Sequence, residues 1–250
     1  MTTAKLGPSE RETALQTLRD PEHELDVLVI GGGITGTGAA LDAVTRGLST
    51  GLVESRDWGF GTSSRSSKLV HGGIRYLEQM NFGLVREALI ERGLLLQRLA
   101  PHLVRPVRFL YPVTTPVIER AYVGAGMMLY DLFARTGGTA PGVPWHQHVS
   151  RRRLVREAPG LRPHAFRGGL SYSDAQVDDA RYVAMLARTA ASYGAHVASR
   201  VRVEGFLKVG ERVVGVTARD LMTDETFEIR AKQVVNATGV WTNDLQALVG

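Results

Sequence analysis

The stretch that decides the fold is residues 26–76, DVLVIGGGITGTGAALDAVTRGLSTGLVESRDWGFGTSSRSSKLVHGGIRY. It opens with four apolar residues, 27–30, which are typical of a buried β-strand. Three glycines in G-x-G-x-x-G spacing follow, then a run of small residues that predicts a helix, then a second apolar strand that ends at Glu54. Together these features predict a βαβ unit that binds a dinucleotide.

The glycines have distinct roles in such a unit. Gly31 lets the chain turn sharply, Gly33 lets the backbone approach a diphosphate, and Gly36 lets the helix pack closely on the strand. The free N–H groups of Ile34 and Thr35, at the positive end of the helix, would face the phosphates. A glycine-rich turn in an ordinary α/β protein is the alternative, but the two strands, the helix and the acid all favour the dinucleotide site.

Glu54 distinguishes between dinucleotides. An acid at the end of the second strand can accept hydrogen bonds from the two ribose hydroxyls, and its charge would repel a 2′-phosphate. We therefore do not expect NADP. The next segment, 59–68, is dense in glycine and hydroxyl side chains that suit a phosphate or a flavin edge. A flexible serine-rich loop is the competing interpretation.

Two blocks of this sequence resemble the FAD-dependent glycerol-3-phosphate dehydrogenases. The first is IGGGITGTG, residues 30–38, and the second is TSSRSSKLVHGGIRYL, residues 62–77. Weaker matches follow at 100–102, 130–131, 172–181 and 236–241. The resemblance covers nearly the whole chain after about residue 24, and its H-G-G-I-R-Y-L core is highly specific.

The resemblance implies the fold and the reaction. We expect an α/β protein with a three-layer, FAD-binding Rossmann-like domain of the glutathione-reductase or amino-acid-oxidase type, and an antiparallel-sheet substrate subdomain, both incomplete here. In the family, FAD takes a hydride at flavin N5 from sn-glycerol 3-phosphate, which becomes dihydroxyacetone phosphate, and the electrons pass to a quinone.

The same resemblance implies the site residues. Arg75 is the first candidate for contact with substrate oxygens, because a guanidinium matches phosphate geometry. His71 is a candidate proton acceptor or flavin-tuning group, and Tyr76 a candidate substrate contact; a structural role is the alternative for each. Val203 resembles the residue whose backbone contacts the adenine edge of FAD in this family. The remaining cofactor contacts are expected at Ser55, Thr62, Ser63, Ser64, Lys68, Leu69, Ala237, Thr238, Gly239 and Trp241.

Composition narrows the function classes. The chain has 250 residues and no cysteine, so redox chemistry must come from a bound cofactor. The net charge is +5, but the one tight basic cluster, 151–153, fits the start of a solvated helix better than a nucleic-acid site. His146 and His148 share a predicted strand without a third ligand, so no metal is expected.

Localisation and partners follow from the same patterns. We expect no signal peptide, because the first 24 residues are polar, and the sequence has no apolar run long enough to span a bilayer. We expect a cytoplasmic protein, peripheral on the inner face of the cell membrane. The most apolar stretch, 121–135, either lies on that surface or forms a buried helix near the substrate pocket. The expected partners are sn-glycerol 3-phosphate, a quinone and a second copy of the chain.

The expected domains alternate along the chain. Residues 1–24 form an extension whose helix begins with a capping box at Ser9, and 25–80 form the first FAD-binding segment. Residues 81–170 start the substrate subdomain, and 171–250 return to the FAD-binding domain. There we expect a helix from Asp178 to about Tyr193, then strands at 196–206, 213–218, 227–229 and 232–236.

Other functions remain open. Family members are about twice this length, so we interpret the chain as an N-terminal part with little activity by itself. An oxidase that reduces oxygen shares the same blocks, and flavin-dependent amine or amino-acid oxidases share the Ala-Thr-Gly-x-Trp pattern. A non-catalytic flavin-binding module and an NAD-dependent dehydrogenase are the more distant alternatives.

Overall fold

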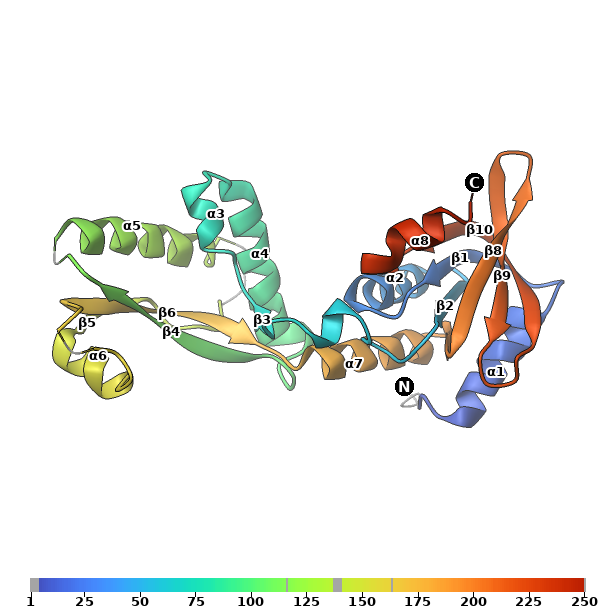
Figure 1. Cartoon of the computed structure of the whole chain (residues 1–250), viewed down its shortest axis with the longest axis horizontal. Coiled ribbons are helices and arrows are strands. Elements are labelled where there is room, and N and C mark those ends of the chain that lie inside the picture. The colour runs from blue at the N-terminus through green and yellow to red at the C-terminus, as the bar shows by residue number, and fades with distance from the viewer. Residues whose placement is uncertain (1–4, 116, 137–140, 163, 250) are drawn as a thin grey trace. The chain divides into compact units, whose positions relative to one another are not determined.

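The computed structural model of the chain describes residues 5–115, 117–136, 141–162 and 164–249. Two compact units form, and each is drawn with its elements in Figure 1. Unit 1 comprises residues 1–66 and 179–250, and unit 2 comprises residues 67–178. The first four residues of the expected N-terminal extension lie outside the described part.

Unit 1 is built on one mixed sheet with helices packed against it. Its helices are α1 (Pro8–Arg19), α2 (Ile34–Thr45), α7 (Asp179–Ser192) and α8 (Thr242–Gln246), with the short 3-10 helices η1 (Thr62–Ser64) and η3 (Gly239–Trp241). Its strands are β1 (Glu24–Ile30), β2 (Thr50–Glu54), β7 (His196–Ser199), β8 (Val201–Val209), β9 (Arg212–Asp220) and β10 (Thr226–Asn236).

The order of strands in this sheet is β7-β2-β1-β10-β9-β8. Strands β7, β2, β1 and β10 run parallel, and β10, β9 and β8 form an antiparallel meander. Strands β1 and β2 with helix α2 are the βαβ unit that the glycine spacing predicted. The α/β fold class is therefore confirmed, with a mixed sheet.

Two strand predictions need correction. The stretch 196–206 is two strands, because Arg200 adopts a left-handed conformation with φ 61° and breaks the extended chain. Strand β7 then pairs with β2, whereas β8 pairs with β9. Conversely, 227–229 and 232–236 are one strand, β10, whose first half pairs with β9 and whose second half pairs with β1.

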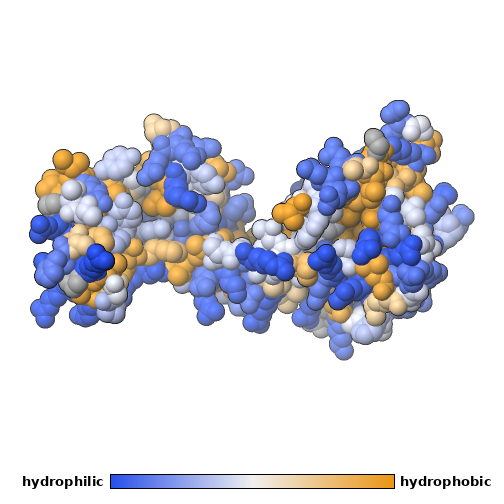
Figure 2. All heavy atoms as spheres, in the orientation of Figure 1, coloured by the Kyte–Doolittle hydropathy of each residue, from blue (hydrophilic) through white to orange (hydrophobic). Residues whose placement is uncertain are grey.

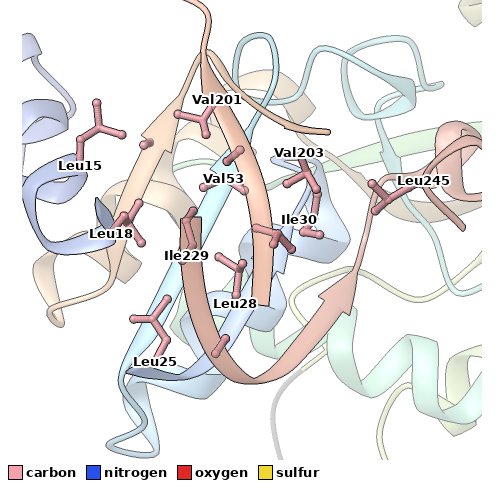
Figure 3. Packing of buried hydrophobic residues seen from close by; sticks show 14 residues of the cluster. Leu15, Leu18, Leu25, Leu28, Ile30, Val53, Val201, Val203, Ile229 and Leu245 are labelled. Atoms are coloured by element: carbon pink, nitrogen blue, oxygen red, sulfur yellow. The ribbon is translucent and has the colours of Figure 1, made fainter. Parts of the chain in front are cut away.

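The core of unit 1 occupies both faces of the sheet. On one face, α2 and α7 cover apolar side chains that include Val29, Leu52 and Val197. On the other face, side chains of α1, of the sheet and of α8 meet in a single cluster, drawn in Figure 3. Burying these apolar side chains is the main force that holds the glycine turn in place.

Helix α1 belongs to this core and is not a separate extension. Leu15 and Leu18 are at most 2% exposed and join the cluster in Figure 3. The expected capping box at Ser9 is wrong. The helix begins at Pro8 with Gly7 as its N-cap, and Glu10 Oε2 accepts from the N–H of Gly7 at 3.2 Å.

Unit 2 combines an antiparallel sheet with short helices. Its helices are α3 (Arg75–Glu78), α4 (Phe82–Leu94) with the π-helical turn η2 (Leu95–Leu99), α5 (Ile118–Phe133) and α6 (Arg151–Glu157). Its strands are β3 (Leu69–Val70), β4 (Arg105–Val113), β5 (Gln147–Ser150) and β6 (Gly168–Gln176). Strand β6 is central: β4 pairs along one edge, and β5 and β3 pair with opposite ends of the other.

The unit boundaries differ from the expected domain boundaries. The sequence predicts residues 67–80 in the FAD-binding domain, but β3 pairs with β6 and these residues belong to unit 2. It predicts 171–178 in the second FAD-binding segment, yet 171–176 complete β6, which pairs with β4 along its whole length, and the stretch belongs to unit 2. Sheet pairing across unit 2 is the physical reason for both differences.

Candidate functional site: a groove at the glycine turn

A groove of about 710 Å³ opens at the carboxyl ends of β1 and β2 in unit 1. This is the position at which open α/β sheets bind their ligands. Thirteen of the residues expected to bind the cofactor line it, from five separate stretches of the chain. They are Gly31, Gly33, Ile34, Thr35, Glu54, Ser55, Thr62, Ser63, Val203, Ala237, Thr238, Gly239 and Trp241.

The glycine turn forms the floor of the groove. Gly31 has φ 114°, and a Cβ there would lie 2.5 Å from the carbonyl oxygen of Ala237. A Cβ on Gly36 would lie 1.8 Å from the carbonyl oxygen of Gly31, so Gly36 packs helix against strand and does not line the groove. Gly33 is different, because a Cβ on it would have one neighbour within 4 Å, Ser63 Oγ at 3.3 Å. The backbone at Gly33 is therefore open to a ligand.

The start of helix α2 points its donors into the groove. The N–H of Ile34 donates to Ser63 Oγ at 2.9 Å, which brings η1 over the end of the helix. The first N–H groups of a helix have no acceptor within the helix, and the helix dipole adds positive potential there. The hydroxyl of Ser63 accepts from one of these donors, Ile34, and a diphosphate is the ligand chemistry that suits the group of them.

Glu54 closes the turn from the end of β2. Its Oε2 accepts from the N–H of Gly32 at 2.6 Å, and its Oε1 accepts from the N–H of Arg56 at 2.6 Å. A carboxylate has about four lone-pair sites, so these two bonds fix its orientation and leave capacity for ligand hydroxyls. Glu54 is thus held in a fixed orientation at the groove wall, the position that the sequence predicted for an acid that binds ribose hydroxyls.

The opposite wall comes from β8 and from the chain after β10. Val203 is 8% exposed and lies where β8 has an irregular register with β9. Thr238 follows β10, and both its N–H and its hydroxyl donate to Asn236 Oδ1, at 3.2 and 2.7 Å. Gly239 then adopts φ 61° and starts η3, which ends at Trp241. These bonds order the Ala-Thr-Gly stretch, and the N–H of Ala237 ties it to the end of β1 by donating to the carbonyl oxygen of Ile30 at 2.8 Å.

The sequence predicted Trp241 and Glu54 in the groove but not the other charged side chains that line it. The guanidinium of Arg56 lies 4.3 Å from the ring centroid of Phe60 and 5.6 Å from that of Trp241. Arg202 and Asp244 also line the groove. The available signal was the position of Arg56, two residues after Glu54, at the end of a strand that the sequence already assigned to the site.

Several predicted residues lie elsewhere. The hydroxyl of Ser64 donates to the carbonyl oxygens of Phe60 and Gly61 and so stabilises the η1 turn. Unit 2 contains two of the expected cofactor contacts, Lys68 and Leu69, and all three substrate candidates. The carbonyl oxygen of Lys68 accepts from the N–H of Val177 at 3.0 Å. The substrate candidates are His71, which is exposed, and Arg75 and Tyr76, which are exposed on α3.

The two histidines considered as metal ligands do not share a strand. His146 precedes β5, and its Nδ1 lies 2.7 Å from Asp131 Oδ2. Across the residues that the structure describes, no group of three His, Cys, Asp or Glu side chains is arranged to hold a metal ion. The same residues contain no helix long and apolar enough to cross a membrane.

The fold and the groove define a Rossmann-like α/β protein that binds a dinucleotide. The family model for FAD dependent oxidoreductases (DAO) matches residues 26–250. The chain therefore belongs to this FAD-dependent oxidoreductase family.

Comparison with individual proteins gives closer likenesses. The chain is 53% identical over 245 residues to glycerol-3-phosphate dehydrogenase 2 of Mycobacterium tuberculosis, covering 98% of the chain and 41% of that protein. It is 40% identical over 240 residues to alpha-glycerophosphate oxidase of Streptococcus pyogenes, covering 94% of the chain and 38% of that protein. The chain thus spans about two fifths of the length of these relatives.

A solved structure agrees with this likeness. The glycerol-3-phosphate dehydrogenase of Bacillus halodurans, crystallised as a complex with FAD, superimposes with a TM-score of 0.70 and 33% sequence identity. The superposition covers 96% of this chain and 39% of that one. The resemblance that the sequence blocks indicated is therefore confirmed at the level of both sequence and fold.

Proposed function

We propose that the chain forms the FAD-binding part of an enzyme that oxidises sn-glycerol 3-phosphate to dihydroxyacetone phosphate. The observation that most supports this proposal is the groove at the α2 N-terminus, in a chain 53% identical to a glycerol-3-phosphate dehydrogenase. The bare backbone at Gly33, the donors at Ile34 and the fixed acid Glu54 fit the needs of an adenine dinucleotide.

In this proposal each wall of the groove binds one portion of FAD. The N–H groups of Ile34 and Thr35, with the hydroxyls of Thr62 and Ser63, would hold the diphosphate. Glu54 would accept from the ribose hydroxyls, and the backbone of Val203 would meet the adenine. When bound, FAD supplies hydride acceptance at the flavin N5, and the protein supplies binding, orientation and charge.

The substrate contacts remain proposals for residues of unit 2. Arg75 would bind substrate oxygens, because its planar guanidinium can bond two oxygens at once. His71 would accept the proton of the reacting hydroxyl, and Tyr76 would donate a hydrogen bond to the substrate. Lys68 and Leu69, in the same segment, would contact the cofactor.

Anaerobic reduction tests the proposed substrate. Full-length protein loaded with FAD should lose its flavin absorbance on addition of sn-glycerol 3-phosphate but not on addition of L-proline or glycine. Arg75→Gln should raise KM for sn-glycerol 3-phosphate by about tenfold or more, because hydrogen bonds to a charged phosphate are lost. Bleaching by the amino acids alone would instead favour an amino-acid oxidase.

The electron acceptor is a quinone in our proposal, with oxygen as the second candidate. The second candidate is supported by the 40% identity to an alpha-glycerophosphate oxidase. Turnover should require an added soluble quinone and should release little peroxide. Peroxide formed in equal amount to dihydroxyacetone phosphate, without quinone, would favour the oxidase.

A quinone acceptor suits a cytoplasmic enzyme held at the inner face of the cell membrane. Apolar side chains exposed in and beside α5 support such a surface, and Figure 2 shows hydrophobic atoms in this region. They are Val117, Ile118, Tyr122, Met128 and Leu132. Sedimentation with vesicles tests the membrane association.

A homodimer is the proposed assembly, and sedimentation without vesicles tests it. The 250 residues alone are expected to turn over little substrate, which an activity assay tests.

A further inference from the structure

A buried charged cluster in unit 2 holds the backbone that follows β3. Arg92 Nη1 donates to Asp174 Oδ1 at 2.6 Å, with the two side chains 1% and 4% exposed. The hydroxyl of Tyr130 donates to the same carboxylate, at 2.9 Å from Oδ1 and 3.1 Å from Oδ2. The N–H of Gly72 reaches both partners, at 2.9 Å from the Tyr130 oxygen and 3.2 Å from Asp174 Oδ1. Tyr130 and Asp174 therefore accept from one amide, and Arg92 holds the carboxylate of Asp174.

The sheet register explains why Asp174 meets this amide. Val70 is the last residue of β3 and pairs with Ala175 of β6. The next position along β6 is Asp174, where the β3 ladder has already ended. Its carboxylate takes the place of a backbone acceptor and receives the N–H of Gly72. A side chain thus continues the pairing by one step beyond the strand.

Helix α4 presents an arginine where its buried face would otherwise be apolar. Val85 and Leu89 are fully buried at helical spacing, and Arg92 follows one turn later at 1% exposure. The Nη1 of Arg92 also donates to the carbonyl oxygen of Ser173 at 3.2 Å. Its Nε has no hydrogen-bond partner among the described residues. Such a group costs free energy to bury, so packing alone does not account for it.

Close packing leaves this backbone little freedom. A Cβ on Gly72 would lie 2.3 Å from Leu89 Cδ2 and 2.6 Å from the Tyr130 oxygen. Gly73 adopts φ 68°, and Ile74 packs into the two apolar clusters around Leu89 and Met127. His71 and Arg75, on either side of this fixed run, are both exposed.

We propose that Arg92, Tyr130 and Asp174 are positioning residues that fix the backbone of residues 71–76 and thereby orient His71 and Arg75. The role in substrate binding rests on the proposed function. A buried ion pair often contributes no more stability than apolar side chains of the same volume, and its best-attested use is to select one geometry. Burial and the charge of Asp174 both raise the pKa of Tyr130, so its hydroxyl stays protonated and keeps donating.

Hydrogen exchange in the full-length protein tests the anchoring directly. Asp174→Asn keeps the shape but removes the charge, and Tyr130→Phe removes one hydroxyl. In each variant the amide of Gly72 should exchange about tenfold faster than in the unmodified protein, because a bond to a buried acceptor is weakened. Glu157→Gln is the matched control, since Glu157 pairs with Arg108 and Arg153 elsewhere in unit 2. It should leave exchange at Gly72 unchanged.

Kinetics separate positioning from general stability. Both variants should raise KM for sn-glycerol 3-phosphate by about tenfold and lower kcat by a smaller factor, while Glu157→Gln changes neither. Tyr130→Phe decides the matter if Asp174→Asn does not fold. Unchanged exchange at Gly72 in the folded variants, or faster exchange with an unchanged KM, would overturn the proposal.

The same experiments distinguish a failure of the proposed function from a failure of the anchoring proposal. If the unmodified protein does not turn over sn-glycerol 3-phosphate, the proposed function is refuted. The anchoring is then supported by faster exchange at Gly72 in the variants, or overturned by equal exchange, because that comparison needs no substrate.

Discussion

Asp220 ends strand β9 with its carboxylate fully buried among cations. Its Oδ1 accepts from Arg11 at 2.6 Å and from the N–H of Met222 at 2.9 Å, and its Oδ2 accepts from Arg19 at 3.1 Å. Burial by itself raises the pKa of Asp220, but the hydrogen bonds and the two positive charges outweigh it and hold the pKa below its ordinary value. The carboxylate therefore joins α1 to the end of the meander.

We predict that Asp220→Asn lowers the free energy of unfolding by about 2 kcal/mol, because Arg11 and Arg19 each lose the buried carboxylate with which they pair. The stabilising effect of Asp220 should be present above the pKa of an unfolded aspartate and lost as pH falls through the lower, folded pKa. Urea unfolding between pH 7 and pH 3 measures both the loss of stability in Asp220→Asn and its dependence on pH. The control is Asp42→Asn, whose exposed pair with Arg46 should matter little. Equal stability of Asp220→Asn and the unmodified protein would contradict the prediction.

His196, at the start of β7, gives a second pH dependence. Burial, and then the nearby charge of His23, lower the pKa of His196 below 6.5. The neutral form is favoured in the folded state, so this contribution to stability is complete above the unfolded pKa and is lost as pH falls through the folded one. We predict that stability decreases on acidification from pH 7 to pH 5, and that His196→Gln flattens this slope. An unchanged slope in denaturant titrations of the variant would refute the assignment.

At the scale of elements, α1 is expected to be part of the folding unit. Leu15 is fully buried in the cluster of Figure 3, so Leu15→Ala should destabilise the protein by about 3 kcal/mol through lost burial and a cavity. Gln16→Ala, one residue further on the exposed face, should have little effect. Thermal unfolding of both variants makes the comparison. If Leu15→Ala were as stable as Gln16→Ala, α1 would be a dispensable extension.

Elements with a local pattern were predictable from the sequence, and elements set by pairing were not. The apolar run before the glycines and the small residues after them predicted β1 and α2. The break at Arg200 was not visible, because a left-handed arginine has no local signal and depends on the different partners of β7 and β8. The single strand β10 was divided for the same reason: its two halves differ in burial because they have different neighbours.

The same contrast holds for the candidate site. Glycine spacing and the terminal acid placed the floor and one wall of the groove, since those residues are close in sequence. Arg202 was not predicted because a lone arginine within a strand gives no pattern, and for Arg56 the one signal was its position two residues after Glu54. The cluster of Arg92, Tyr130 and Asp174 joins three distant segments, so only the folded chain reveals it.

For the molecule as a whole, the proposed function requires that FAD occupies the groove of unit 1. Gly33 offers a sharp test, because its φ of −83° and open surroundings allow an alanine without backbone strain. The added methyl group would stand where the diphosphate approaches the backbone. Gly38 is the matched control, on the same helix with nothing within 4 Å of its Cβ position.

Titration calorimetry of FAD into the apoprotein is the most direct measurement. We expect one FAD bound per chain, a Kd raised about tenfold or more by Gly33→Ala, and a Kd unchanged by Gly38→Ala. Absence of FAD binding, or equal affinity in the unmodified protein and Gly33→Ala, would contradict it.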